Sequence, residues 1–361
     1  MSREKVYNFS AGPSMMPESV LKRAGAEIMD YKGSGMSVME MSHRSSIFVD
    51  IFSETKAKLR RALKVPDSHE ILFLQGGATL QFAAIPMNLM GKPGCADYAV
   101  TGNFSTLAAK EAAKYGRVNI ACDSSDKGHS YIPKELSLSE DASYFYYCAN
   151  NTIYGTEWKH IPDVGDRTLV CDMSSNIISK PVDVAKYGLI YAGAQKNMAP
   201  AGLTVVIIDK ALAGRELPIC PSVMSYATLI EKDSMLNTPP CWCIYMLGLM
   251  LDWLESIGGV EEMEKLKSYR AKLLYDQLDE SRLFIPHAQP DSRSDMNVTF
   301  RTGSDELDAR FIKGASERGL LNLKGHRLTG GMRASLYNAM PVEGVEALID
   351  YMKEFEVRHH V

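Results

Sequence analysis

The sequence predicts an α/β fold, with a mainly parallel sheet in a large domain and a small α+β domain at its C-terminal end. Two observations carry this prediction. From about residue 70, short apolar runs alternate with amphipathic stretches, a rhythm typical of a parallel sheet covered by helices on both faces. From about residue 258 one long helical pattern replaces this rhythm, and shorter strand and helix patterns follow it.

The length supports two domains. The chain has 361 residues, whereas a single hydrophobic core usually stops growing at roughly 250–300 residues. We expect residues 1–15 to form an N-terminal arm associated with the small domain. Residues 16–259 would form the large domain, which would also bind a cofactor, and residues 260–361 the small domain.

In the large domain, each expected element is an apolar run followed by a turn or a helix. "EILFLQGGATLQFAAIPMNLM" predicts a strand, a glycine turn and a helix, and "ADYAVTGNFSTLAAKEAAKYG" repeats that scheme. "SYFYYCANNTIYG" and "RTLVCDMSS" predict strands that lead into polar loops, and residues 189–192 and 203–208 predict two more. Beyond the long helix from residue 258, we expect strands at "MNVTFR", "LLNLKGH" and "MRASLYN" and helices at "SDELDARFIKGASERG" and from Val342.

Composition and charge exclude several classes of protein. A net charge of -4, from 40 basic and 44 acidic residues, gives no excess of positive charge for binding nucleic acid or an anionic membrane. The most apolar stretch, "CWCIYMLGLMLDWL", is shorter than the roughly 20 residues that a membrane helix needs. The opening "MSREKVYNFSAGP" lacks the apolar centre of a signal peptide. The seven cysteines form no CxxC pair and the eight histidines no HExxH pattern. We therefore expect a cytoplasmic enzyme without a metal.

The chemistry of the chain is concentrated where the expected strands end, which is where ligands bind in such sheets. Lys196 is the only charged residue between Leu189 and Ile208. The other residues that follow strands are Ala78, Thr79, Phe104, Thr152 and Asp172. Taken singly, most of them would be turn, capping or core residues, and a lone lysine can also extend along an apolar surface towards water. Together they match the requirements of pyridoxal phosphate.

Pyridoxal phosphate needs a lysine that holds its aldehyde as a Schiff base and an acidic partner for its pyridinium nitrogen. Asp172 precedes Lys196 by 24 residues, one excursion of strand, loop, helix and strand, so both side chains can face one crevice. The helix that opens at Ala78 and Thr79 offers backbone N–H groups to the phosphate. Phe104 could stack on the ring, and Thr152 could donate to its phenolate oxygen.

A second set of residues predicts anion binding. His43 and Arg44 lie in "SVMEMSHRSS", and "NLKGHRLTGGMRAS" carries His326, Arg327 and Arg333. Short basic clusters are usually solvated, but arginine binds carboxylate and phosphate bidentately. This many cationic donors predicts a substrate with two anionic groups.

The segment "LNTPP" has a simple structural interpretation: Thr238 as N-cap and Pro239 as first residue of the apolar helix that follows. Asn237 and Thr238 could still serve a phosphate at that helix end. The helix is more apolar than a half-exposed helix requires, which we attribute to a subunit interface.

Several segments carry a family resemblance that runs from about residue 7 to the C-terminal end. They are "NFSAGPSMMP", "SVMEMSHR", "GGATLQF", "YAGAQKNMAPAGLTVVII", "LNTPP" and "KGHRLTGGMRASLYNAMPVEGV". They resemble the phosphoserine aminotransferase family, within the class V aminotransferases.

The resemblance implies a fold-type-I pyridoxal-phosphate-dependent transferase with a sheet of the seven-stranded type, working as a homodimer. It implies transfer of the amino group of glutamate to 3-phosphohydroxypyruvate, giving O-phosphoserine and 2-oxoglutarate. Bacterial members also act on 3-hydroxy-2-oxo-4-phosphobutanoate, giving 4-phosphohydroxythreonine for pyridoxine biosynthesis.

The resemblance also implies a role for each candidate residue. Lys196 would form the Schiff base and Asp172 would contact the pyridinium nitrogen. The cofactor contacts would be Ala78, Thr79, Thr152 and Gln195, with Asn237 and Thr238 reaching the phosphate from the neighbouring subunit. Arg44 and Arg333 would bind substrate with His43 close by, and His326 and Arg327 would come from the partner chain.

This sequence departs from the family pattern at three places. Phe104 stands where many relatives have tryptophan, so stacking should persist over a smaller area. Ala78 and Thr79 replace a Gly-Arg pair found in some members, which removes any side-chain contribution of that arginine to phosphate binding. Ala11 replaces a serine of some members, so no substrate contact is assigned to it.

Three other functions fit the sequence less well. A cysteine desulfurase needs a thiol near the small domain, but the last cysteine is Cys243, and Gln195 stands where desulfurases have histidine before the lysine. A non-enzymatic, cofactor-binding regulator would have lost Lys196 or Asp172, and both are present. A nicotinamide dehydrogenase would carry a GxGxxG motif after the strand at Ile71, where none occurs.

Overall fold

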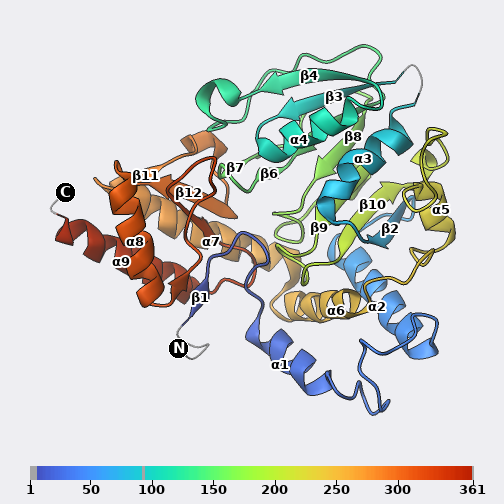
Figure 1. The fold of residues 1–361 in the computed structure, drawn as a ribbon, viewed down its shortest axis with the longest axis horizontal. Helices are drawn as coiled ribbons and strands as arrows, with labels where there is room; N and C mark the ends of the chain where they lie inside the picture. The colour runs from blue at the N-terminus through green and yellow to red at the C-terminus, as the bar shows by residue number, and fades with distance from the viewer. Residues whose placement is uncertain (1–5, 92–93, 360–361) are drawn as a thin grey trace.

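A mixed sheet forms the centre of the large part of the molecule (Figure 1). The computed structural model describes residues 6–91 and 94–359, and in these residues the sheet has seven strands in the order β2-β10-β9-β8-β5-β3-β4. They are β2 (His69–Leu74), β3 (Cys95–Val100), β4 (Arg117–Asp123), β5 (Tyr144–Cys148), β8 (Thr168–Asp172), β9 (Leu189–Gly193) and β10 (Thr204–Asp209). β10 runs antiparallel to both of its neighbours, and the other pairings are parallel. The predicted mainly parallel sheet is confirmed.

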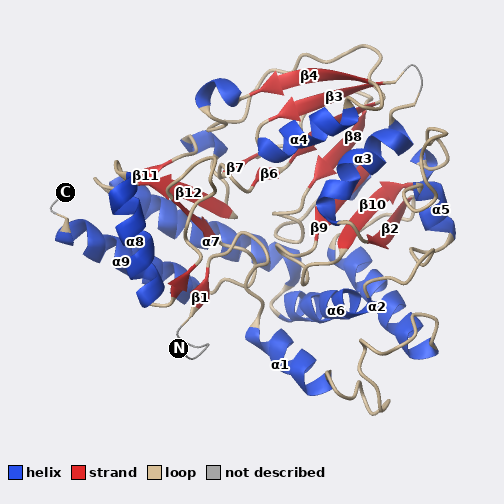
Figure 2. Ribbon diagram, viewed as in Figure 1, coloured by secondary structure: helices blue, strands red, loops and turns tan. Residues whose placement is uncertain are grey.

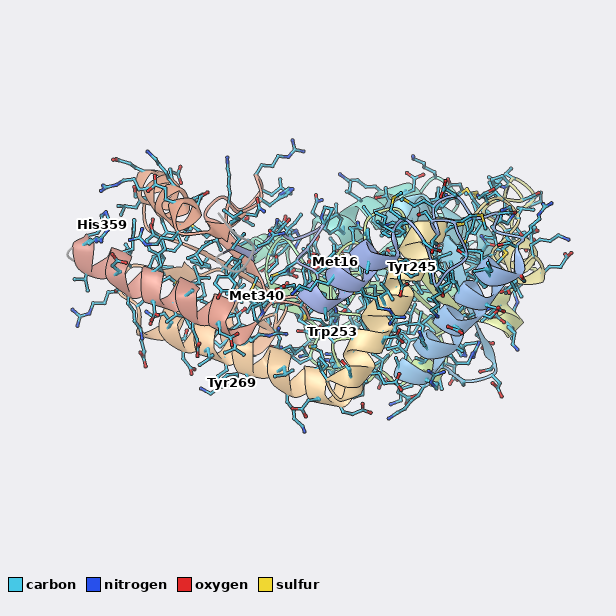
Figure 3. All side chains as sticks on the ribbon, turned by 90° about the horizontal axis from the view of Figure 1, so that it is seen from below. Met16, Tyr245, Trp253, Tyr269, Met340 and His359 are labelled. Carbon is cyan, nitrogen blue, oxygen red and sulfur yellow. The ribbon has the colours of Figure 1, made fainter. Side chains whose placement is uncertain are left out.

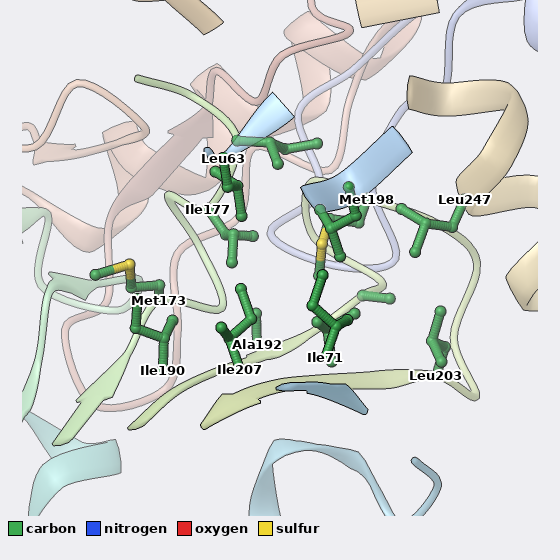
Figure 4. Close-up of a cluster of buried hydrophobic side chains, with 14 of the residues drawn as sticks. Leu63, Ile71, Met173, Ile177, Ile190, Ala192, Met198, Leu203, Ile207 and Leu247 are labelled. Carbon is green, nitrogen blue, oxygen red and sulfur yellow. The ribbon is translucent and has the colours of Figure 1, made fainter. Parts of the chain in front are cut away.

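Helices cover both faces of this sheet, as the alternating pattern predicts (Figure 2). One face packs against α3 (Gly77–Leu89), α4 (Asn103–Ala112) and α5 (Tyr226–Glu231). The other face packs against α2 (Ser46–Ala62) and α6 (Cys241–Ser256), and α1 (Glu18–Glu27) lies against α6. Figure 4 shows part of the second core, a cluster of buried side chains that includes Ile71, Ile190 and Ile207 of the sheet and Leu247 of α6. Because successive side chains of a strand point to opposite faces of the sheet, consecutive apolar residues pack alternately into the two cores.

Helix α6 corrects two expectations. Its N-cap is Pro240 and its first residue is Cys241, so Thr238 lies outside the helix and does not cap it. The helix is buried along most of its length in the core of its own chain, from Cys243 to Leu251 and at Leu254. Its apolar sequence is therefore explained by packing against the sheet and α2, and it does not indicate a subunit interface.

The C-terminal part forms a separate hydrophobic core. Its elements are α7 (Gly259–Glu280), β11 (Ile285–Pro286), β12 (Asn297–Arg301), α8 (Asp305–Glu317), β13 (Leu320–Leu321), β14 (Met332–Ser335) and α9 (Val342–Arg358). Figure 3 shows α7, marked by Tyr269, leading away from the end of α6 near Trp253 towards this part. The N-terminal strand β1 (Tyr7–Asn8) pairs in parallel with β13. The domain boundaries at residues 15 and 259 stay predictions.

No single described helix is long and apolar enough to cross a membrane. Only α6 and α7 taken together, with a bend of 79° between them, meet that test by length and composition. A buried core helix meets it as readily, and α6 is such a helix.

Candidate active site

Lys196 lies in the loop between β9 and β10, at the end of the sheet where β8 and β9 finish. Its Nζ donates a hydrogen bond of 2.8 Å to Thr152 Oγ1 and lies 5.0 Å from the centroid of the Phe104 ring. Burial lowers the pKa of Lys196 below its ordinary value, and the charge of Arg333 acts in the same direction while that of Asp172 opposes it. The amine is therefore more readily neutral than that of a surface lysine.

Apolar residues of the loop around Lys196 anchor it in the hydrophobic core. Met198 and Leu203 are buried in the core on the α6 face, as Figure 4 shows. Next to Lys196, the Asn197 side chain donates from Nδ2 to the carbonyl of Ile177 at 2.6 Å and accepts from the backbone N–H of Asn338 at 2.9 Å. These contacts fix the backbone that follows Lys196.

The N-terminal arm packs on the other side of the same loop. The Ser14 backbone N–H donates to the Gln195 carbonyl at 3.0 Å, and the Ser14 hydroxyl donates to the Lys196 carbonyl. Gly12 comes so close that a Cβ atom on it would lie 3.1 Å from Lys196 Cγ, and its φ of +131° favours glycine. A small residue at position 12 is therefore a requirement of the site.

Asp172 is the last residue of β8 and pairs with Tyr191 of the adjacent strand β9. The carboxylate is buried and accepts two hydrogen bonds: Oδ1 from the backbone N–H of Ser174 at 2.8 Å, and Oδ2 from the Tyr191 hydroxyl at 3.1 Å. The Ser174 hydroxyl in turn accepts from the backbone N–H of Gly193 at 3.0 Å, which ties the two strand ends together. The Asp172 carboxylate is thus held in place near enough to Lys196 for their charges to interact.

The glycine turn before α3 lies next to the lysine loop. Gly76 and Gly77 both have positive φ, +88° and +67°, and the helix begins at Gly77. A Cβ atom on Gly193, at the end of β9, would lie 3.5 Å from Ala78 Cβ, so the first turn of α3 approaches the strand that leads to Lys196. The first N–H groups of a helix have no partner within it, so Ala78 and Thr79 present donors here.

Arg333 enters the site from the C-terminal part. It lies on β14, and its Nη1 donates to the Thr152 carbonyl at 3.3 Å, so one residue, Thr152, contacts both Arg333 and Lys196. Burial lowers the pKa of Arg333. His326 and Arg327 lie in the loop before β14, and burial together with the charges of Arg333 and Arg327 lowers the pKa of His326.

Five of the predicted site residues remain apart from this cluster. Among the described residues, no hydrogen bond or ion pair links Lys196, Thr152 or Asp172 to any of them: His43, Arg44, Asn237, Thr238 and Arg327. Asn237 instead donates to Gln75 Oε1 at 2.7 Å, beside the glycine turn of its own chain. Arg44, Asn237, Thr238 and Arg327 are exposed. Gln195 lies next to Lys196, with its Oε1 atom 3.0 Å from where a Cβ on Gly193 would be.

Sequence reasoning missed three residues that the structure places at the site: Ser14, Ser174 and Tyr191. Ser174 follows the strand end at Asp172, so its position was the available signal. Tyr191 sits in an apolar strand, where a tyrosine gives no sign of what its hydroxyl meets.

Comparisons with known proteins agree on one family. The sequence profile of the class-V aminotransferases matches residues 6–348. A phosphoserine aminotransferase of Pseudomonas fluorescens is 50% identical over 358 residues, which cover 99% of both chains.

Solved structures give the same result. A phosphoserine aminotransferase from Bacillus circulans subsp. alkalophilus superposes with a TM-score of 0.96 at 42% identity, covering 99% of both chains. A phosphoserine aminotransferase from Trichomonas vaginalis with bound pyridoxal phosphate has a TM-score of 0.92 at 40% identity, covering 96% of this chain and 99% of the other. The chain therefore belongs to the class V aminotransferase family and is a pyridoxal-phosphate-dependent aminotransferase.

Proposed function

We propose that this aminotransferase transfers the amino group of glutamate to 3-phosphohydroxypyruvate, giving O-phosphoserine and 2-oxoglutarate in serine biosynthesis. The observation that carries the proposal is the convergence of Lys196, Thr152 and Arg333, beside Asp172, in a chain whose relatives over 99% of its length are phosphoserine aminotransferases. We further propose 3-hydroxy-2-oxo-4-phosphobutanoate, a second phosphorylated 2-oxo acid, as substrate for pyridoxine biosynthesis.

The residues present fit pyridoxal phosphate. When bound, this cofactor supplies an aldehyde carbon for covalent attachment and a pyridinium ring that accepts electrons. Lys196 would provide the amine for the attachment, and Asp172, already held by Ser174 and Tyr191, would hold the proton at the pyridinium nitrogen.

The remaining cofactor contacts would surround these two residues. Phe104 offers an aromatic face 5.0 Å from the Lys196 amine, and the Thr152 hydroxyl offers a hydrogen bond. The N–H groups of Ala78 and Thr79 would bind the phosphate, with Gln195 next to the lysine as a further polar contact. Asn237 and Thr238 would reach a phosphate from the neighbouring subunit.

Lys196 would also move the proton that transamination requires. A base must be neutral to accept a proton, and burial lowers the pKa of this amine. Asp172 opposes that effect only in part, so the neutral fraction of Lys196 exceeds that of an exposed lysine at the same pH. The Thr152 hydroxyl, 2.8 Å away, would orient the Lys196 nitrogen towards the reacting carbon.

The cationic side chains would select the substrate. Arg333 is half-buried beside Thr152 and would bind a carboxylate bidentately. Arg44 with His43 close by, and His326 with Arg327, would provide further donors for the second anionic group.

We propose that the enzyme is a homodimer that shares its active sites between subunits. Arg327, Asn237 and Thr238 are exposed and make no bond to the Lys196 cluster within the described part of one chain, so a partner would have to bring them to it. Large apolar side chains are also exposed, which supports a subunit interface elsewhere than on α6. They include Met29 at 81%, Ile219 at 68%, Val223 at 60% and Met39 at 57% exposure.

We also propose a cytoplasmic location. All seven cysteines lie in the described residues and are unpaired, which fits a reducing compartment.

The decisive experiment measures the reverse reaction with 2-oxoglutarate and compares O-phosphoserine with serine as amino donor. We expect serine to be far poorer, because an analogue without phosphate leaves the cationic groups that face the substrate unpaired. Comparable kcat/KM values for the two donors would disprove the proposed substrate.

A further inference from the structure

The two oxygens of the Asp172 carboxylate have different partners, and only one of them comes from the local turn. Ser174 N–H, two residues along the chain, donates to Oδ1, as happens at many turns. The Tyr191 hydroxyl, from the neighbouring strand, donates to Oδ2 at 3.1 Å. Tyr191 is fully buried, so no bulk water competes for this hydroxyl.

The Asp172 carboxylate sets the direction in which two tyrosine hydroxyls donate. The Tyr146 hydroxyl lies 2.8 Å from that of Tyr191, and Tyr146 is also buried. A carboxylate oxygen only accepts hydrogen bonds, and each hydroxyl carries a single hydrogen. The hydrogen of Tyr191 therefore goes to Asp172, and the hydrogen between the two tyrosines belongs to Tyr146. The result is a chain of donors from Tyr146 to Tyr191 to Asp172.

Both tyrosines stay protonated over the working pH range. Burial raises the pKa of Tyr191 well above its ordinary value, and the charge of Asp172 adds to this. Burial and the charge of Asp172 raise the pKa of Tyr146 in the same way. The chain of donors is therefore permanent.

We propose that Tyr191 is a positioning residue: its hydroxyl, oriented by Tyr146, donates to the Asp172 carboxylate and fixes it for the pyridinium ring. This inference rests on the role proposed above for Asp172. A hydrogen bond to the charged form of a group favours that form. Without the Tyr191 donor, the carboxylate would take a larger share of the ring proton, and the ring would accept electrons less well.

The same core contains a matched control. The hydroxyls of Tyr98 and Tyr144 lie 2.7 Å apart, and the Tyr98 ring stacks on that of Tyr146 with centroids 4.8 Å apart. Tyr98 is as buried as Tyr191, and among the described residues its hydroxyl bonds only to Tyr144. Tyr98→Phe therefore removes one buried tyrosine hydroxyl without touching the donor chain.

The experiment measures the affinity of the apoenzyme for pyridoxal phosphate in a double-mutant cycle of Tyr191→Phe and Asp172→Asn. We expect Tyr191→Phe to weaken binding about tenfold with Asp172 present, because the lost bond has a charged acceptor. In the Asp172→Asn background, the same change should alter binding less than about twofold, because no charge is left to stabilise. Equal weakening in both backgrounds would mean that Tyr191 acts by packing alone and would overturn the inference.

A spectroscopic readout separates positioning from loss of stability. The absorption of the bound cofactor changes with pH, and the midpoint of this change should move to higher pH in Tyr191→Phe. In Tyr98→Phe the midpoint should equal that of wild type, even if both variants lose the same thermal stability. Should Tyr191→Phe fail to fold, Tyr146→Phe tests the same chain one step away and should shift the midpoint in the same direction by less. Identical midpoints for wild type and the variant that folds would refute the proposal. If the wild-type protein transaminates O-phosphoserine but the Tyr191 and Tyr146 variants have the same midpoint as Tyr98→Phe, only this inference fails. If the wild-type protein does not transaminate O-phosphoserine, the proposed function fails.

Discussion

Lys196 Nζ donates a hydrogen bond of 2.8 Å to Thr152 Oγ1, although 44 residues separate the two in the chain. Thr152 follows β5 and the short strand β6 (Asn150–Asn151), and Lys196 follows β9, with β8 lying between β5 and β9 in the sheet. Because parallel strands finish at the same edge, residues that follow different strands meet there. The Thr152 carbonyl also accepts from Arg333, so this one residue joins the lysine to the C-terminal part.

Lys196→Ala should give a folded protein without turnover. The amine is both the proposed attachment point of the cofactor and the proposed base, and losing a general base alone costs roughly 10²–10⁴-fold in rate. Lys186→Ala, which removes an exposed lysine from a weak surface ion pair, is the control and should retain full activity. The measurement is steady-state transamination with circular dichroism as a check on folding. Near-wild-type turnover would disprove the central assignment.

Asp172→Asn should retain cofactor yet lose most activity. A neutral amide does not hold the pyridinium proton, so the ring accepts electrons poorly. The test mixes the loaded variant with glutamate and follows the half-reaction by absorbance in a stopped-flow instrument. A rate equal to that of wild type would show that Asp172 only closes the turn at Ser174.

The rate at which the apoenzyme captures pyridoxal phosphate should rise with pH and level off below the range of ordinary lysine. The neutral amine is the attacking form, and burial lowers the pKa of Lys196. The amine is protonated below that lowered pKa and neutral above it, so the rate increases through it. Stopped-flow absorbance from mildly acidic to strongly alkaline pH checks this. A rate still rising through about 10.4, the value for an unperturbed lysine, would contradict the effect of burial.

Gly12→Ala should destabilise the protein and weaken cofactor binding. The added Cβ would lie 3.1 Å from Lys196 Cγ at a backbone φ of +131°, and such strain costs on the order of 1–3 kcal/mol. Gly25→Ala is the control, because Gly25 lies in helix α1 with open space around it and should gain roughly 0.5–1 kcal/mol. Thermal unfolding of both variants and cofactor titration of the apoenzymes decide the matter. Equal effects of the two substitutions would show that the arm does not constrain the lysine loop.

Mixing two inactive variants should restore activity if Arg327 acts across the subunit interface. In a hybrid dimer of Lys196→Ala and Arg327→Ala, one site would carry both defects and the other neither. The variants are dissociated, mixed and reassociated, and activity is compared with each variant treated alone. No recovery, with hybrid dimers shown by mass spectrometry, would mean that Arg327 serves its own chain.

Local patterns in the amino-acid sequence were enough to predict the sheet, the helices on its two faces and the loop that carries Lys196. Those patterns are apolar runs with turn residues between them, and a lone lysine where a buried strand ends. Asp172 could be paired with Lys196 for the same reason, since both follow strands that finish at one edge.

The partners of these residues depend on how the elements pack in three dimensions. Tyr191 gives the same apolar pattern whether its hydroxyl meets carbon or Asp172, and the difference arises because β9 lies beside β8. Helix α6 illustrates the same limit: its apolar sequence fits an interface as well as a core, and packing against α2 and the sheet placed it in the core. Hydrophobic periodicity fixes which face of an element is buried, but the neighbour that buries it depends on strand order and on contacts far apart in the chain.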